Sequence, residues 1–355
     1  MYETAAEAAT QQARQVPPAV HRLAIASRLG PLQKIYYGRQ ATLWYRAMGG
    51  ICILVGALLT ALFSDISATL FAGWSLGQSL FVLILGLAWI GVGIWLMITS
   101  FLKKRCAIFV YVQGLIVQKR GVEALRWEHL EKLWKTLRMQ DDDVAHYSYT
   151  VRRADGVRFV FNSDLPDVEA LGSLLEEQIT SHVLPVVLTS YQAGSAISFD
   201  ALTVSRQGIE TRKKTLTWPQ VKHIYIDDVM VRFYKKGEVA PAITVASAKL
   251  ANLKVLKTLL DYVRLSRTSA PEATIERLYL LFQAGLPLKF GILSISNAGV
   301  TVRDEIRLPW HTIEGITLAG NEVVIAGKNG ECLQSVPLEM VSDSSSLKAL
   351  LIALS

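Results

Sequence analysis

The sequence lacks every short pattern that assembles a common catalytic or nucleotide-binding site. It contains no HExxH, GxSxG, GxxxxGKS/T or GxGxxG motif. Its six histidines show no metal-ligand spacing: His21, His129, His146, His182, His223 and His311. We therefore expect a protein that is not an enzyme and that has no cofactor or resident metal; catalysis is an outside alternative.

Cysteine is scarce as well. The three cysteines, Cys52, Cys106 and Cys332, are too far apart for a zinc cluster or a disulfide framework. Such sparse use of cysteine is typical of a reducing compartment. The run Asp141 to Asp143 offers carboxylates for a divalent cation, but such a run is more often a solvated loop tip.

Charged residues are few, at 19% against 51% apolar residues. Two runs contain no ionisable side chain, Ala47 to Phe63 and Ser79 to Leu102. Each is about as long as a bilayer-crossing helix, which predicts a transmembrane hairpin with spans at about 44–63 and 79–102. A pair of buried core helices is the alternative. Basic residues flank the two runs and are absent from the connecting loop, so we expect both ends on the cytoplasmic side.

What the sequence does contain is a repeat. Trp127, Trp218 and Trp310 stand in the related stretches LRWEHLEKL, LTWPQVKHI and LPWHTIEGI, at intervals of 218 − 127 = 91 and 310 − 218 = 92 residues. So steady a period indicates a duplicated domain. We expect each tryptophan in a core, with a ligand-stacking role as the alternative. A glycine precedes each tryptophan at a predicted hairpin: Gly114, Gly208 and Gly299.

Each repeat begins with the alternation of strands and ends with the pattern of an amphipathic helix, for which Asp167, Asn252 and Ser346 are the expected N-caps. The first repeat lacks the lead-in strand of the other two, unless residues 33–38 supply it. The predicted organisation is a mobile N-terminal tail (1–30), a membrane hairpin (31–105), a first repeat that is incomplete without that strand (106–185), a second repeat (186–268), a linker (269–275) and a third repeat (276–355).

Antiparallel strands closed by one helix, together with the glycine hairpin and the tryptophan segment, resemble the pleckstrin-homology-like (PH-like) domains of bacterial membrane proteins. One uncharacterised family of the domain-of-unknown-function class is similar in this respect. The resemblance covers residues 106–355 for the domains and 44–102 for the anchor. It implies the fold class: a two-helix transmembrane hairpin plus α+β repeats, namely three tandem PH-like small β-barrels, each closed by a C-terminal helix. It also implies a bacterial inner-membrane protein with both termini and all repeats in the cytoplasm.

The repeats differ in charge. Lysine and arginine less aspartate and glutamate gives 9 − 12 = −3 for residues 106–185, 13 − 6 = +7 for 186–268 and 6 − 8 = −2 for 276–355. The basic surplus of the second repeat predicts docking on anionic lipid headgroups, with a solubilising surface as the alternative. The candidate lipid-binding residues are Arg212, Lys213, Lys214, Lys222, Lys235 and Lys236.

We therefore expect a non-enzymatic, membrane-anchored binding or scaffold protein that docks on anionic lipid. The alternative is a module that recruits a protein partner, through its surfaces or exposed strand edges, in membrane-associated signalling or envelope maintenance. Nucleic acid is not an expected partner, because the basic residues are not interleaved with exposed aromatic residues.

Overall fold

The computed structural model describes residues 16–38, 43–66, 76–102, 106–119, 121–139, 145–163, 165–268, 270–328 and 330–354. The chain divides into two compact units, Met1–Arg126 with Ser163–Val168, and Trp127–Asn162 with Glu169–Ser355. This boundary passes through the first predicted repeat. Within the tail predicted at 1–30, residues 1–15 lie outside the described residues and Pro18–Ala26 form helix α2. The aspartates at 141–143 also lie outside them.

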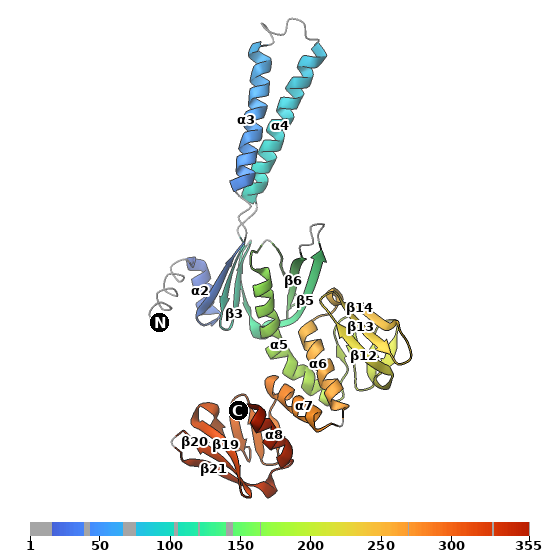
Figure 1. The fold of residues 1–355 in the computed structure, drawn as a ribbon. Helices are drawn as coiled ribbons and strands as arrows, with labels where there is room; N and C mark the ends of the chain where they lie inside the picture. Colours follow the sequence, from blue (N-terminus) through green and yellow to red (C-terminus); the bar gives the residue numbers. More distant parts are fainter. Residues whose placement is uncertain are drawn as a thin grey trace. The chain divides into compact units, whose positions relative to one another are not determined.

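In the first unit, four antiparallel strands form one sheet in the order β1-β2-β3-β4 (Figure 1). Ile35 pairs with Phe109 and Tyr36 with Ile108, so residues 33–38 supply the lead-in strand of the first repeat, one of the two alternatives that the sequence left open. The strands are β1 (Leu32–Tyr37), β2 (Ala107–Tyr111), β3 (Gly114–Gln118) and β4 (Val122–Arg126).

Two helices, α3 (Leu43–Ile66) and α4 (Leu76–Leu102), pack against each other in the first unit (Figure 1). Small residues bring them together, since a Cβ atom on Gly56 would lie 2.7 Å from the carbonyl oxygen of Gly86. A Cβ atom on Gly93 would come equally close, 2.7 Å, to the carbonyl oxygen of Gly49. Larger side chains at these positions would push the helices apart.

No helix in the described part of the chain is long and apolar enough to cross a membrane. The predicted transmembrane hairpin is corrected to a hairpin of two packed helices. The expectation of an integral inner-membrane protein rested on that hairpin and is corrected too.

The second unit contains the rest of the first repeat and the whole of the second. A sheet of β5 (Leu130–Met139), β6 (Ala145–Arg153) and β7 (Arg158–Phe161) precedes helix α5 (Val168–Gln192). The second repeat has a four-stranded sheet of β8 (Ile197–Ser198), β9 (Thr203–Val204), β10 (Gly208–Glu210) and β11 (Thr215–Thr217). A three-stranded sheet and a helix follow, namely β12 (Val221–Ile226), β13 (Met230–Lys235), β14 (Pro241–Ala246) and α6 (Leu253–Ser266).

The third repeat has the same order after one additional helix. Helix α7 (Pro271–Gln283) begins inside the stretch 269–275 that was expected to be a linker. Four strands follow, β15 (Leu288–Phe290), β16 (Leu293–Ser296), β17 (Gly299–Val302) and β18 (Ile306–Pro309). The repeat ends with β19 (Ile313–Ala319), β20 (Glu322–Gly327), β21 (Cys332–Pro337) and helix α8 (Ser344–Leu354).

The predicted closed β-barrels are wrong for the described residues, because each repeat has two separate, open antiparallel sheets. In the second repeat, a short 3₁₀ turn at Trp218–Gln220 carries the chain from β11 in one sheet to β12 in the other. No ladder joins these two strands, so β12 is an edge strand with β13 as its sheet neighbour. The apolar faces of the sheets and helices in the second and third repeats instead contribute to one continuous core.

The three-stranded sheets repeat in detail as well as in order. Each has a bulge directly after its first residue, between Leu130 and Lys132 in β5, between Val221 and His223 in β12, and between Ile313 and Gly315 in β19. The residue six positions after each tryptophan is then paired with a residue of the middle strand at the same register. Equivalent positions in different repeats can therefore be compared one by one.

Candidate functional site

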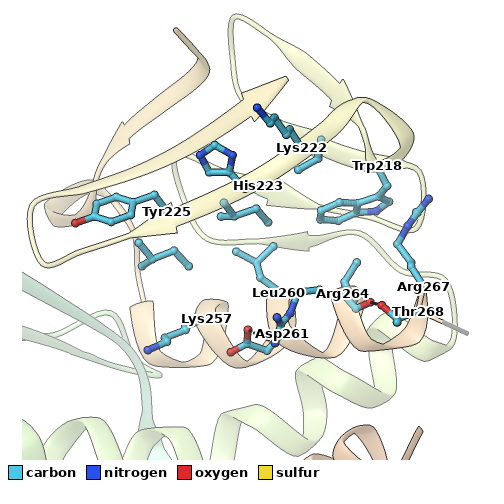
Figure 2. A pocket seen from close by; sticks show the side chains of 14 residues that line it. Trp218, Lys222, His223, Tyr225, Lys257, Leu260, Asp261, Arg264, Arg267 and Thr268 are labelled. Atoms are coloured by element: carbon cyan, nitrogen blue, oxygen red, sulfur yellow. Dashed lines mark hydrogen bonds and ion pairs between the residues drawn. The ribbon is translucent and has the colours of Figure 1, made fainter. Parts of the chain in front are cut away.

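One of two large openings in the second repeat lies between the edge strand β12 and helix α6. We call it the β12–α6 groove; its volume is about 680 Å³. Figure 2 shows the groove with β12 along one wall and α6 along the other, and Leu260 between them. Its floor is apolar, because Leu260 and Val263 are only 4% and 3% exposed. Trp218 lines one end.

The equivalent groove of the first repeat, between β5 and α5, is filled by the chain itself. Asn252, the residue before α6, accepts a hydrogen bond from the backbone N–H of Leu133 through its side-chain oxygen, at 2.8 Å. Its side-chain nitrogen donates to the carbonyl of Glu131 at 2.8 Å, and its backbone N–H donates to the carbonyl of Leu133 at 2.8 Å. What remains open beside them is a cavity of about 10 Å³.

Asn252 thus occupies the edge of β5 as a neighbouring strand would. Both the N–H and the C=O group of Leu133 point away from β6, because both bond to Asn252. Leu133 and Ile224 are equivalent, each six residues after the repeated tryptophan and at the same register beyond the bulge. The N–H and C=O groups of Ile224 therefore point away from β13, toward the open side of β12.

Basic side chains surround the β12–α6 groove. Lys222 lies on the strand wall, and Lys257, Arg264 and Arg267 follow one face of α6 (Figure 2). Asp261 is the one carboxylate among the lining residues, and it lies 3.8 Å from Arg264. These residues give the lining a formal charge of 4 − 1 = +3.

The first repeat has no surplus of cations at the equivalent positions, because Lys132 and Lys135, which stand where His223 and Ile226 line the groove, are offset by Glu131 and Glu176. Counting back 91 residues along the strand and 85 along the helix, Lys222 corresponds to Glu131, and Asp261 to Glu176. By the same count, Lys257, Arg264 and Arg267 correspond to Gly172, Ile179 and His182. Burial raises the pKa of Glu176, and the cations of Lys135 and Lys254 lower it. The filled groove therefore places a basic residue of its occupant, Lys254, near a carboxylate.

The six residues predicted to bind lipid do not line one site. Arg212, Lys213 and Lys214 lie at the β10–β11 turn and line a second opening, of about 690 Å³, beside β14. Within this opening Lys214 donates to the carbonyl of Ala242 at 2.9 Å. Lys222 lines the β12–α6 groove instead.

The other two predicted residues, Lys235 and Lys236, stand where β13 ends. Lys235 forms an ion pair with Glu238 at 3.0 Å, and the backbone N–H of Lys236 donates to Gln220.

The repeated glycines are explained by close contacts between adjacent strands. A Cβ atom on Gly114, Gly208 or Gly299 would lie 2.2 Å from a backbone carbonyl oxygen of the next strand, a distance at which atoms overlap. Gly299 also has a φ of +141°, which side-chain-bearing residues rarely adopt. Glycine is therefore required at this position of every repeat.

The repeated tryptophans differ in burial. Trp127 and Trp218 are 3% and 6% exposed, whereas Trp310 is half-buried. The indole N–H of Trp218 donates to the carbonyl of Ser205, and that of Trp310 donates to the equivalent carbonyl of Ser296, both at 2.8 Å. The same hydrogen bond thus fixes the ring in two repeats.

Three comparisons with known proteins bear on this site. The model of a family of unknown function, DUF6585, matches residues 21–269. The chain belongs to DUF6585. The matched region contains both walls of the β12–α6 groove, and the third repeat follows it. No curated protein matches, and no solved structure matches, so neither the PH-like resemblance nor a bacterial origin is confirmed for this DUF6585 chain.

Sequence reasoning missed two features of the site. Asn252 precedes α6 as predicted, but its side chain does not cap the helix; it bonds to β5 instead. The second feature is the row of cations on α6, whose spacing of seven and three residues between Lys257, Arg264 and Arg267 is visible in the sequence. Nothing in the sequence says which face of α6 borders a groove.

Proposed function

We propose that this chain is a non-enzymatic binding protein that recruits a protein partner, and that an extended segment of the partner pairs with the free edge of β12. This is β-augmentation, in which main-chain hydrogen bonds give affinity and side-chain contacts give specificity. The proposal corresponds to the alternative that the sequence left open beside lipid docking.

One observation carries the proposal. The first repeat shows what the site accepts, because Asn252 bonds to both backbone groups of Leu133 in the β5–α5 groove. The second repeat presents the same edge, at the same register, beside an opening of about 680 Å³. A strand edge with unpaired backbone groups is a template for another chain. The partner takes in the second repeat the place that Asn252 takes in the first.

Docking on anionic lipid receives less support. It needs several cations on one exposed surface, and the structure distributes the six candidates among two openings and a hairpin. Lys214 and Lys235 are further engaged by a carbonyl and a carboxylate. The residues Arg212 and Lys213 remain the best candidates for such binding, and the vesicle experiment below measures their contribution.

A peptide-display selection on the immobilised full chain tests the proposal. The library contains random peptides of about ten residues, which is long enough to form one strand. The key variant is Ile224→Pro, which removes the outward N–H group; an edge strand tolerates proline at such a position. Ile224→Ala is its matched control, because it loses the same side chain and keeps the N–H group.

We expect the parent and Ile224→Ala to enrich the same peptides and Ile224→Pro to enrich none of them. Selection of the same peptides by Ile224→Pro would contradict strand pairing at β12, and so would the absence of any enrichment. Vesicles that contain phosphatidylserine form the second arm of the experiment. Vesicle binding by the parent that disappears on changing Arg212 and Lys213 to glutamate would favour lipid docking instead.

A further inference from the structure

We infer that the segment bound in the β12–α6 groove is acidic, with carboxylates that meet the cations of α6 and Lys222. This inference rests on the proposed function and deepens it, since strand pairing by itself does not depend on the charge of the partner's side chains. It assigns the class of partner as a protein with an exposed, extended, acidic segment.

The charges of the groove are available to a ligand. Lys222, Lys257 and Arg267 are exposed, and none of them has a carboxylate within ion-pair distance among the described residues. Arg264 is also exposed, and its contact with Asp261 is long, at 3.8 Å. A neutral or basic segment would leave these cations uncompensated next to each other.

The charge of the groove differs between the two repeats. In the first repeat the equivalent positions hold Glu131 and Glu176 together with Lys132 and Lys135, a formal charge of 2 − 2 = 0, and the segment that fills the groove brings Lys254. In the second repeat Glu131 is replaced by Lys222, and three helix positions have gained cations. The fold does not require this change, because the same sheet and helix form without it. The lining thus changes from neutral to a formal charge of +3, which favours an acidic occupant.

The pairing register with β12 determines which cations the segment contacts. A segment that pairs with Ile224 lies between Lys222 on the strand side and the cations of α6 on the helix side (Figure 2). Side chains of a paired strand alternate between the two faces of the sheet, so every second residue of the segment faces α6. Acidic residues at two or three positions of the segment therefore reach cations.

The peptides enriched on the full chain provide the test. We expect them to be rich in glutamate and aspartate and poor in proline. Replacing their acidic residues with glutamine or asparagine should weaken binding about two-fold for each ion pair removed, or about eight-fold for three, as measured by fluorescence anisotropy at physiological salt. The loss should become larger at low salt, where screening is weaker.

Two charge-reversal variants of the full chain locate the effect. The first changes Lys257, Arg264 and Arg267 to glutamate. The matched control changes Arg212, Lys213 and Lys236 to glutamate, which alters the net charge equally outside the groove. We expect the first variant to lose the acidic peptides and the control to keep them.

Each outcome separates the inference from the proposed function. Enrichment of neutral or basic peptides that still depends on the N–H group of Ile224 would overturn the acidic partner and leave strand pairing in place. Equal loss in both charge variants would also overturn it, because the attraction would then be a property of net charge. Enrichment that does not depend on Ile224 would overturn the proposed function itself.

Discussion

Replacing Asn252 with glycine should uncover the edge of β5. The substitution removes two hydrogen bonds, those of the side chain with the N–H of Leu133 and with the carbonyl of Glu131, both 2.8 Å long. It leaves the backbone unstrained, because Asn252 has a φ of 54°, a conformation that glycine adopts readily. The third bond, from the backbone N–H of Asn252 to Leu133, is retained. The variant therefore isolates the contribution of the side chain.

The expected cost follows from these two bonds. A hydrogen bond of this kind contributes about 1 kcal/mol net, so two contribute about 2 kcal/mol. A change of about 2 kcal/mol in local opening corresponds to about 30-fold faster amide exchange, since 1.4 kcal/mol is a factor of ten. The amide of Leu133 should show this increase in full, because it loses its acceptor.

Hydrogen–deuterium exchange of the β5 segment measures the effect. The control is Asp343→Gly, which introduces glycine at a similar φ of 52° before the helix of the third repeat. We expect faster exchange at Leu133 in Asn252→Gly and an unchanged rate there in the control. An unchanged rate at Leu133 in both variants would refute the reasoning that Asn252 acts as a strand on the edge of β5. It would also remove the internal model for the groove of the second repeat.

Three further predictions test the fold. Trp218→Ala should lower the free energy of unfolding by about 3 to 5 kcal/mol. Trp310→Ala should lower it by less, because the ring of Trp310 is only half-buried. Urea titration of both variants measures the two losses, and equal losses would contradict this account. Gly208→Ala should lower the melting temperature, whereas Gly121→Ala, which has open space, should not. Two backbone N–H groups lower the pKa of Asp227. The stability that the ionised carboxylate gives to the folded state is therefore present above its unfolded pKa and is lost as the pH falls through its folded pKa. The loss of stability as the pH falls below about 4 should therefore be smaller in Asp227→Asn than in the parent.

The repeat could be predicted from the sequence because it depends on contacts that require particular residue types at fixed spacings. Glycine at 114, 208 and 299 avoids an overlap with a neighbouring strand, and the indole N–H groups of Trp218 and Trp310 bond to equivalent carbonyls. These contacts recur at nearly the same spacing, so the pattern indicated a duplicated domain. The pairing of residues 33–38 with β2 could also be proposed from the sequence, because few other segments could form the missing strand.

The predictions of barrel closure and of the role of Asn252 were wrong because both depend on long-range contacts. Whether two sheets close into a barrel depends on ladders between distant strands, and alternation within each strand is the same in either case. The role of Asn252 depends on Leu133, 119 residues earlier in the chain, whereas its position before a helix indicated a cap. Hydropathy alone suggested a membrane crossing for 44–63 and 79–102, and the described residues contain no helix that could make one.

The exchange rate of the Ile224 amide tests the central claim most directly. It is measured in the full chain with and without a saturating amount of an acidic peptide from the display selection. We predict rapid exchange of Ile224 in the free chain and slow exchange with peptide, while Leu133, already bonded to Asn252, exchanges slowly in both states. An Ile224 amide that exchanges equally fast with the peptide bound would contradict pairing of the partner with β12.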